Sequence, residues 1–405
     1  MIKFALIKER KTPPDRRVVF SPEKLKEAVE KFPEARFQVE SSGIRIFTDE
    51  EYRQAGFEVS EDISGCDVML GVKEVPLPYL IPDKKYFFFS HTIKKQPYNR
   101  DLLREILKNN IELYDHEVII NETGGRLIGF GRYAGLVGAY NGFRGIGLKN
   151  GIFELPKAES LPDLNAMLAE LDKVSIPPLK IVLTGSGKVA YGAREILDHL
   201  QVENVGVEEF LENDFERPVY CHVDVLDYNK RKDGSKGSNS EFYKHPELYE
   251  SDFRRFTRAA DFFIAGHFYG EGAPVFFTAE DAKSPDFRIK YIADISCDIA
   301  GPVASTIRPS TIAEPFYGYE PQEKREVDFR EKESILVMAV DNLPCELPKD
   351  ASEGFGEMFL ENVLPAFFNG DRNGILERAR MTKNGKLTAR FEYLSDYVKG
   401  EEIGI

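Results

Sequence analysis

A short segment near the middle of the chain has the residue pattern of a phosphate-binding turn. The apolar run Ile181–Leu183 leads directly into a turn with two glycines, and a segment with helix-like spacing of apolar residues follows without a gap. A helix that begins on such a turn directs unpaired backbone N–H groups and the positive end of its dipole toward one place, which suits a phosphate. The pattern predicts a dinucleotide site at Gly185, Ser186, Gly187, Lys188 and Val189.

An acidic residue about 20 positions after such a turn commonly binds the adenine-side ribose. Glu208 holds this place, at the end of the short apolar run 205–207, with Glu209 as its rival. Either carboxylate would accept hydrogen bonds from a ribose and repel a 2′-phosphate, which favours NAD. Lys188 could compensate a 2′-phosphate, so NADP stays open. A glycine turn that only joins a strand to a helix is the alternative, because this pattern alone is a weak signal.

Polar residues of both charges follow the expected strands of the first 120 or so residues. These strands, at 2–7, 36–39, 68–72, 86–89 and 111–114, alternate with helices, which predicts a parallel sheet. Ligands of such sheets bind beyond the carboxyl ends of the strands. His91 follows three phenylalanines, so we expect it at the rim of an apolar layer, where an imidazole can exchange protons near neutral pH. The other residues at these ends are Arg16, Arg17, Lys73, Glu74, Ser90, Lys94, Asp115 and Glu117.

The rest of the chain indicates a second domain of the same kind. Residues 130–148 are rich in glycine and lack proline, which predicts a helix packed very closely against a neighbour. Residues 229–240 have the composition of a mobile surface loop. Later strands are expected at 262–265, at 291–293 with Asp298 after it, and at 335–339 with Asn342 after it. If this domain is also doubly wound, those ends lie on the same side as the glycine turn.

The expected fold class is α/β, with two doubly wound, Rossmann-like parallel-sheet domains that flank a cleft. We assign residues 1–145 to a substrate and catalytic domain, to which residues from about 340 to 405 return. Residues 146–174 connect it to a dinucleotide-binding domain over residues 175–335.

Composition excludes several classes of function. The chain has 405 residues, 42% of them hydrophobic, and a net charge of −14 without a basic cluster, which argues against binding to nucleic acid or an anionic membrane. Its four cysteines are far apart and form no metal-ligand pattern, so no metal is expected. The first residues read as a strand rather than a signal peptide, and we expect a cytoplasmic protein of undetermined oligomeric state.

Hydride transfer at the carbon of an imine or amine needs a group that handles protons, a carboxylate anchor and exclusion of water. The residues above therefore favour an amino-acid or opine-type dehydrogenase. Several segments are similar to the lysine–ketoglutarate reductase half of the bifunctional lysine-degrading enzyme. More distantly they resemble fungal saccharopine dehydrogenase of the lysine-forming type and alanine dehydrogenase. These segments are RRVVFSP (16–22), GVKEVP (71–76), FFFSHTIKKQPYN (87–99), LYDHEVI (113–119), GGRLIGFGRYAG (124–135), ADISCDIAG (293–301) and DNLPCELPKDASEGFG (341–356).

The resemblance implies an activity and roles for particular residues. The activity is the reductive condensation of L-lysine with 2-oxoglutarate to saccharopine, or the reverse, with a nicotinamide cofactor. Lys73 and His91 would be the acid–base pair, and Arg17 would grip a substrate carboxylate. The residues implied to shape the dicarboxylate substrate are Glu74, Lys94, Glu117 and Arg126. Those implied to lie near the nicotinamide are Asp298, Asn342 and Leu343.

The sequence differs from these enzymes in two respects, and two other functions are alternatives to the implied one. The spacing around residues 11–15 is one residue longer than in the fungal enzymes, so no role is carried over there. The second half of the bifunctional enzyme is absent, which implies a monofunctional enzyme. The alternatives are an alanine-dehydrogenase-like enzyme that uses a 2-oxo acid and ammonia, and a dinucleotide-binding protein without catalysis.

Overall fold

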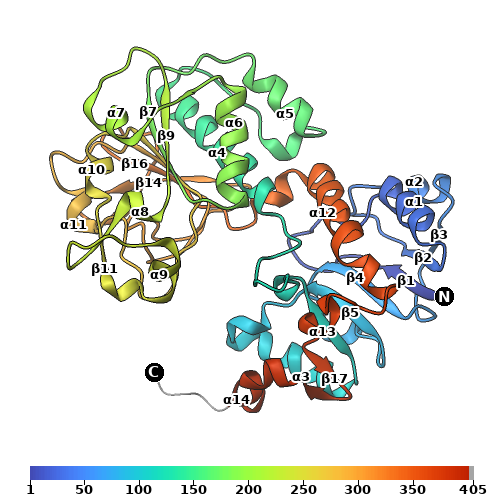
Figure 1. Cartoon of the computed structure of the whole chain (residues 1–405). Helices are drawn as coiled ribbons and strands as arrows, with labels where there is room; N and C mark the ends of the chain where they lie inside the picture. The colour runs from blue at the N-terminus through green and yellow to red at the C-terminus, as the bar shows by residue number, and fades with distance from the viewer. Residues whose placement is uncertain (401–405) are drawn as a thin grey trace. The chain divides into compact units, whose positions relative to one another are not determined.

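The structure is a computed structural model that describes residues 1–400, and the chain divides into two compact units (Figure 1). Unit 1 consists of Met1–Phe130 and the chain from Pro348 onward, and unit 2 consists of Gly131–Leu347. Residues 131–174, which we expected in the first domain and a connecting segment, therefore lie in unit 2. Within residues 1–400, no helix combines the length and the apolar character needed to cross a membrane.

Unit 1 is built on a six-stranded sheet in the order β3-β2-β1-β4-β5-β6, and all five pairs of neighbours are parallel. The chain order reverses between β1 and β4, which is the switch point where doubly wound sheets bind ligands. The strands are β1 (Ile2–Leu6), β2 (Ala35–Glu40), β3 (Glu58–Ser60), β4 (Val68–Lys73), β5 (Lys85–Phe89) and β6 (Glu112–Asp115). The helices before the unit boundary are α1 (Pro22–Lys31), α2 (Asp49–Gln54) and α3 (Arg100–Lys108).

The C-terminal segment returns to unit 1, as the sequence predicted. Its main helix is α12 (Pro348–Asn362), whose Ser352 Oγ accepts a hydrogen bond from Val18 N at 3.0 Å. Phe359 of the same helix packs edge-on against Phe20, with 5.5 Å between ring centroids. The chain continues through α13 (Ile375–Ala379), the short strands β17 (Thr382–Lys383) and β18 (Lys386–Leu387), and α14 (Ser395–Lys399). This segment is an integral part of the packing of unit 1.

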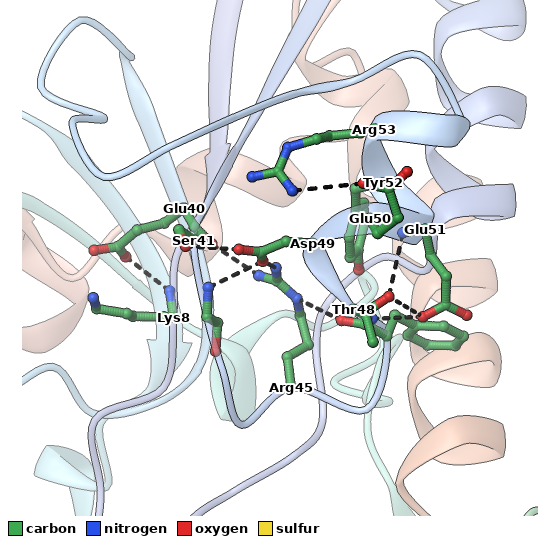
Figure 2. A network of polar contacts seen from close by, with 12 residues as sticks. Lys8, Glu40, Ser41, Arg45, Thr48, Asp49, Glu50, Glu51, Tyr52 and Arg53 are labelled. Atoms are coloured by element: carbon green, nitrogen blue, oxygen red, sulfur yellow. Dashed lines mark hydrogen bonds and ion pairs between the residues drawn. The ribbon is translucent and has the colours of Figure 1, made fainter.

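A polar network ties the chain after β1 and β2 to α2 (Figure 2). The Arg45 guanidinium is buried and donates to the Glu40 carbonyl at 3.0 Å and to the Asp49 carboxylate at 2.6 Å. The Asp49 carboxylate also accepts from Ser41 Oγ at 2.6 Å, and the Glu40 carboxylate accepts from Lys8 N at 2.8 Å. These bonds fix the start of the loop that leaves β1, which carries several candidate site residues.

The sheet of unit 2 has eight strands in the order β15-β14-β16-β13-β12-β7-β9-β8. It is mixed, since β14 runs antiparallel to both β16 and β15, whereas the other neighbours are parallel. Its strands are β7 (Lys180–Thr184), β8 (Glu203–Asn204), β9 (Val219–Val223), β12 (Phe262–Ala265), β13 (Tyr291–Asp294), β14 (Phe316–Glu320), β15 (Arg325–Val327) and β16 (Ile335–Met338). Outside this sheet, β10 (Asn229–Arg231) pairs antiparallel with β11 (Tyr249–Ser251). Its helices are α4 (Gly131–Asn150), α5 (Leu164–Leu171), α6 (Lys188–His199), α7 (Val207–Glu212), α8 (Val225–Tyr228), α9 (Asn239–Lys244), α10 (Arg254–Thr257) and α11 (Ala279–Ala282).

The apolar run 205–207 does not form a strand. The strand at this place, β8, covers only Glu203–Asn204, and Gly206 caps the N-terminus of α7. The run of three apolar positions is short and contains a glycine, while Glu208 and Glu209 fall in the first helical turn, where the helix dipole favours carboxylates. The local sequence therefore favours a helix start over a longer strand.

The glycine-rich segment forms the 20-residue helix α4, close to the predicted 130–148, and it packs closely against α6. A Cβ atom built on Gly135 would overlap the carbonyl oxygen of Val189, and one built on Gly192 would overlap that of Arg132. Both overlaps involve backbone atoms that cannot rotate away. The glycines therefore allow the two helix backbones to approach each other, as the sequence predicted.

Replacing Gly135 by alanine should destabilise unit 2 by about 3 kcal/mol, because overpacking a close contact typically costs about 1–3 kcal/mol and here the obstacle is backbone. Urea unfolding of the variant and the wild-type protein measures the difference. Gly65→Ala is the control, since a Cβ atom there meets nothing within 4 Å. Equal losses in both variants would contradict close packing as the cause.

Candidate active site

The register of unit 1 places three predicted residues at neighbouring strand ends. Lys73 is the last residue of β4 and pairs with Phe89, the last residue of β5. His91 follows two residues after β5, and Glu117 follows two residues after β6. Since β4, β5 and β6 are parallel neighbours, Lys73, His91 and Glu117 follow consecutive strands at one edge of the sheet.

The Glu117 carboxylate is the centre of a cluster of charged groups at this edge. One of its oxygens lies 3.5 Å from His91 Nδ1, and the other lies 3.7 Å from Lys94 Nζ and 3.5 Å from an Arg126 guanidinium nitrogen. Glu117 is 8% exposed. Burial opposes its ionisation, but His91, Lys94 and Arg126 outweigh burial and lower the pKa of Glu117. The cluster brings together four of the predicted residues around a carboxylate that stays ionised.

Asp115 fixes the backbone of the two loops that carry His91 and Glu117. Its buried carboxylate accepts hydrogen bonds from Ser90 N at 2.9 Å and from Glu117 N at 2.8 Å. His91 has a left-handed backbone with φ +54°, a conformation that costs a residue with a Cβ atom about 1–2 kcal/mol. The surrounding hydrogen bonds hold His91 in this conformation, which is typical of functional positions.

Glu9, which the sequence analysis did not select, binds the backbone at Lys73. Its carboxyl group accepts hydrogen bonds from Val72 N at 2.7 Å and Lys73 N at 2.9 Å, where the register between β4 and β5 shifts. Burial raises the pKa of Glu9 to about 8, and the nearby Asp15 carboxylate adds to the shift. Buried His116 donates to the carbonyl of Gly71 at 2.8 Å, so side chains hold the whole end of β4.

Arg17 lies in this region but binds a residue of its own loop. Its Nε and Nη2 donate to the two carboxylate oxygens of Asp15 at 3.0 and 2.7 Å, and its guanidinium lies 4.2 Å from the centre of the Phe130 ring. Burial opposes ionisation of Asp15, but Arg17 outweighs it, and with a smaller contribution from Lys73 lowers the pKa of Asp15. A substrate carboxylate at Arg17 would therefore have to share the guanidinium with Asp15.

Glu74 also has a partner within unit 1, because its carboxylate forms an ion pair with Lys11. Lys11 and Asp15 both belong to the stretch to which the sequence analysis assigned no role. The structure shows that this stretch supplies the partners of two predicted substrate-binding residues, Glu74 and Arg17.

The glycine turn of unit 2 has the geometry that a phosphate requires. Gly185 has φ +106°, and a Cβ atom there would overlap the carbonyl oxygen of Gly266. Gly187 is the N-cap of α6, and a Cβ atom on it would meet nothing within 4 Å. The N-terminus of a 12-residue helix thus opens onto free space, with Ser186 before it and Lys188 and Val189 in its first turn. A dinucleotide pyrophosphate fits this arrangement.

The remaining predicted cofactor residues follow other strands of the same sheet. Asp298 comes shortly after β13, and Asn342 and Leu343 come shortly after β16, which is the parallel neighbour of β13. Leu343 is buried close to Gly138 of α4. Glu208 is exposed in the first turn of α7 and does not follow the strand beside β7. Over residues 1–400 there is no group of three or more His, Cys, Asp or Glu side chains that could hold a metal ion.

Comparisons with known proteins agree with this fold. Residues 5–137 match the family model described as alanine dehydrogenase/PNT, N-terminal domain. The chain is 31% identical over 401 residues to the alpha-aminoadipic semialdehyde synthase of Arabidopsis thaliana, a match that covers 89% of the chain and 38% of that protein. It is 26% identical to the saccharopine dehydrogenase [NAD(+), L-lysine-forming] of Yarrowia lipolytica, over 80% of the chain and 82% of that protein.

A solved structure of L-alanine dehydrogenase shares the fold, with a TM-score of 0.66 and 17% sequence identity, over 98% of this chain and all of that chain. The resemblance stated from the sequence is confirmed by the similarity of the chain to the Arabidopsis thaliana and Yarrowia lipolytica enzymes. The chain spans less than half of the length of the Arabidopsis relative.

The stability of the protein should fall as the pH rises from about 5 to about 8, in part because of Glu9. Its pKa of about 8 in the folded protein exceeds its ordinary value of 4.5, so the folded state holds an extra proton in this range. This contribution is fully present below pH 4.5 and is lost as the pH rises through 8. Glu9→Gln, which stays neutral, should remove on the order of a few kcal/mol of this total fall in the free energy of unfolding while losing one hydrogen bond to Val72 or Lys73.

Urea unfolding at several pH values measures this slope, with Glu23→Gln as the control. Glu23 is exposed in the first turn of α1, and its replacement should leave the slope unchanged. The assignment to Glu9 is refuted if Glu9→Gln keeps the full slope of the wild-type protein.

Proposed function

We propose that the chain is a nicotinamide-dependent oxidoreductase of CH–NH bonds, which condenses L-lysine with 2-oxoglutarate to saccharopine or catalyses the reverse. The observation that carries the proposal is the cluster around Glu117, in which His91, Lys94 and Arg126 lie within 3.7 Å of one carboxylate. The activity for which the Yarrowia lipolytica relative is named and the similarity to the Arabidopsis enzyme support it.

In the condensation direction, the lysine ε-amine adds to the carbonyl carbon of the oxo acid, water leaves, and the resulting imine is reduced to a secondary amine. Each step before reduction moves a proton to or from nitrogen or oxygen. We assign these transfers to His91 and Lys73. The Glu117 carboxylate, 3.5 Å from His91 Nδ1, favours a proton on that nitrogen and leaves Nε2 to exchange protons with the substrate.

Lys94 and Arg126 are the candidates for binding the substrate carboxylates. Their side chains are 51% and 60% exposed while their charged ends face the nearly buried Glu117. A cation that is held at one end of a cluster and open to solvent can bind a carboxylate, and the Arg126 guanidinium can do so with two hydrogen bonds. Arg17 and Glu74 would contribute only after exchanging their partners Asp15 and Lys11.

The proposed cofactor is NAD, held at Gly185, Ser186, Gly187 and the first turn of α6. When bound, its nicotinamide supplies or accepts the hydride. Asp298, Asn342 and Leu343 remain the candidates for contacts near the nicotinamide. The proposal also includes lysine, 2-oxoglutarate and saccharopine as the small-molecule partners, and the cytoplasmic location stays a prediction.

Replacing His91 by alanine should lower turnover by about 10²–10⁴-fold, because a positioned acid or base contributes that much to proton transfer. His245→Ala is the matched control, since His245 is exposed in unit 2 and its ring pairs with nearby Glu247 at 3.2 Å. Initial rates and circular dichroism of both variants separate catalysis from folding. Unchanged turnover in His91→Ala would remove His91 from the mechanism.

The oxidation of reduced nicotinamide, followed by its absorbance, should require lysine together with 2-oxoglutarate. Parallel reactions with pyruvate and ammonia test the alanine-dehydrogenase-like alternative, which needs a smaller pocket and no second carboxylate anchor. Turnover only with pyruvate and ammonia would replace the proposed substrates. Dinucleotide binding without turnover on either pair would favour a binding protein.

A further inference from the structure

Glu346 and Asn141 form a buried polar pair in unit 2, where α4 contacts the turn that follows β16. The Asn141 amide donates to one Glu346 carboxyl oxygen at 2.9 Å, and the two residues are 1% (Asn141) and 3% (Glu346) exposed. A buried polar group is tolerated when a hydrogen bond compensates for its lost hydration. A shift of the turn along the helix would break this bond and leave both groups buried without it, so the pair favours one arrangement of the turn.

The same turn carries two of the candidate contacts near the nicotinamide. It is a 3₁₀ helix over Leu343–Glu346 with Asn342 as its N-cap residue, and Cys345 N donates to the carbonyl of Asn342 at 2.9 Å. The turn lies shortly beyond the carboxyl end of β16, where ligands of doubly wound sheets bind. The inference that follows rests on the proposed dinucleotide site and concerns how this turn is held in place.

Both ends of the turn are attached to one face of α4. Leu343, at its start, is buried, and a Cβ atom built on Gly138 would lie 3.2 Å from Leu343 Cδ1. Glu346, at its end, binds Asn141, which stands three positions after Gly138 and therefore on the same helix face. Apolar contact has no preferred direction, so the hydrogen bond defines how the turn sits on the helix.

The titratable groups that face Glu346 come from the two elements packed against the turn. These groups are Arg144 and Tyr140 on α4, and Lys157 and Glu159 at the 3₁₀ turn 158–160. Burial raises the pKa of Glu346 to about 7, and the hydrogen bond from Asn141 and the two cations offset only part of this effect. Glu346 therefore changes its protonation state near neutral pH.

We propose that Glu346 is a positioning residue, which through Asn141 holds the turn of Asn342 and Leu343 in the arrangement that binds the nicotinamide half of the dinucleotide. Protonated Glu346 keeps this arrangement. Its ionisation places a charge in the buried contact, which is unfavourable, so the ionised form favours arrangements in which the carboxylate reaches water. Since only the held arrangement binds well, the affinity for the dinucleotide decreases as the pH rises through 7.

Calorimetric titration of the full chain with NADH and, separately, NADPH tests this proposal without requiring turnover. Glu346→Ala should weaken binding about 5- to 100-fold at about pH 6, since it leaves the Asn141 amide buried without its partner. Asn141→Ala should weaken binding in the same way. The variant with both replacements should lose less than the product of the two single effects, because both remove one interaction.

The conservative variant Glu346→Gln separates positioning from general stability. Its amide oxygen can still accept from Asn141, and the side chain cannot ionise. It should bind as tightly as the wild-type protein at about pH 6. Between about pH 7 and 9 the wild-type affinity should fall by up to about tenfold per pH unit through Glu346, and Glu346→Gln should lack this fall.

Glu216→Gln is the matched control, since Glu216 is exposed in unit 2, and it should change neither the affinity nor its pH dependence. Urea unfolding of every variant reports its stability. The proposal is overturned if Glu346→Ala loses stability but binds with wild-type affinity, or if Glu346→Gln keeps the full pH dependence. Wild-type protein that binds neither dinucleotide would overturn both this proposal and the proposed function. Binding that depends on Glu346 as described, without turnover of lysine and 2-oxoglutarate, would support this proposal and refute the proposed reaction.

Discussion

The main-chain pairing of parallel strands is the constraint on which both candidate sites depend. Parallel neighbours lie about 4.8 Å apart and end on the same side of the sheet. In unit 1 the neighbours β1, β4, β5 and β6 therefore bring together loops that begin up to 110 positions apart in the sequence, which carry Glu9, Lys73, His91 and Glu117. The reversal of chain order between β1 and β4 makes the flanking loops diverge at the same edge, which leaves room for a ligand.

Burial gives the carboxyl groups of this edge different proton affinities. A buried carboxyl group stays ionised only if cations or hydrogen bonds compensate for lost hydration. Glu117 has three cationic neighbours and Asp15 has Arg17, and the pKa of each is lowered. Glu9 and Asp115 have mainly hydrogen bonds, and burial raises the pKa of each. Groups of the same chemical type that hold protons differently within one small region are typical of sites that move protons.

Much of this site could be predicted from the sequence, because strand ends are visible in the pattern of apolar runs. Lys73, His91 and Glu117 each follow such a run, and the structure places them at consecutive strand ends. Glu9 could not be found in this way. It stands in the charged stretch that follows β1, and its sequence neighbours indicate a solvated loop. Only the three-dimensional fold shows that its carboxyl group accepts hydrogen bonds from Val72 N and Lys73 N at the end of β4.

The strand order of unit 2 shows the limit of motif spacing as a guide. The rule of about 20 residues assumes that the next strand along the chain is also the next strand in the sheet. Here a two-residue strand, β8, takes the edge, and β9 takes the place beside β7. Spacing alone therefore leads to Glu208, whereas hydrogen bonding shows that the neighbour of β7 is β9, which ends at Val223. Spacing along the chain therefore does not identify which residues lie beside the glycine turn, because strand pairing and not chain order decides which strands are neighbours.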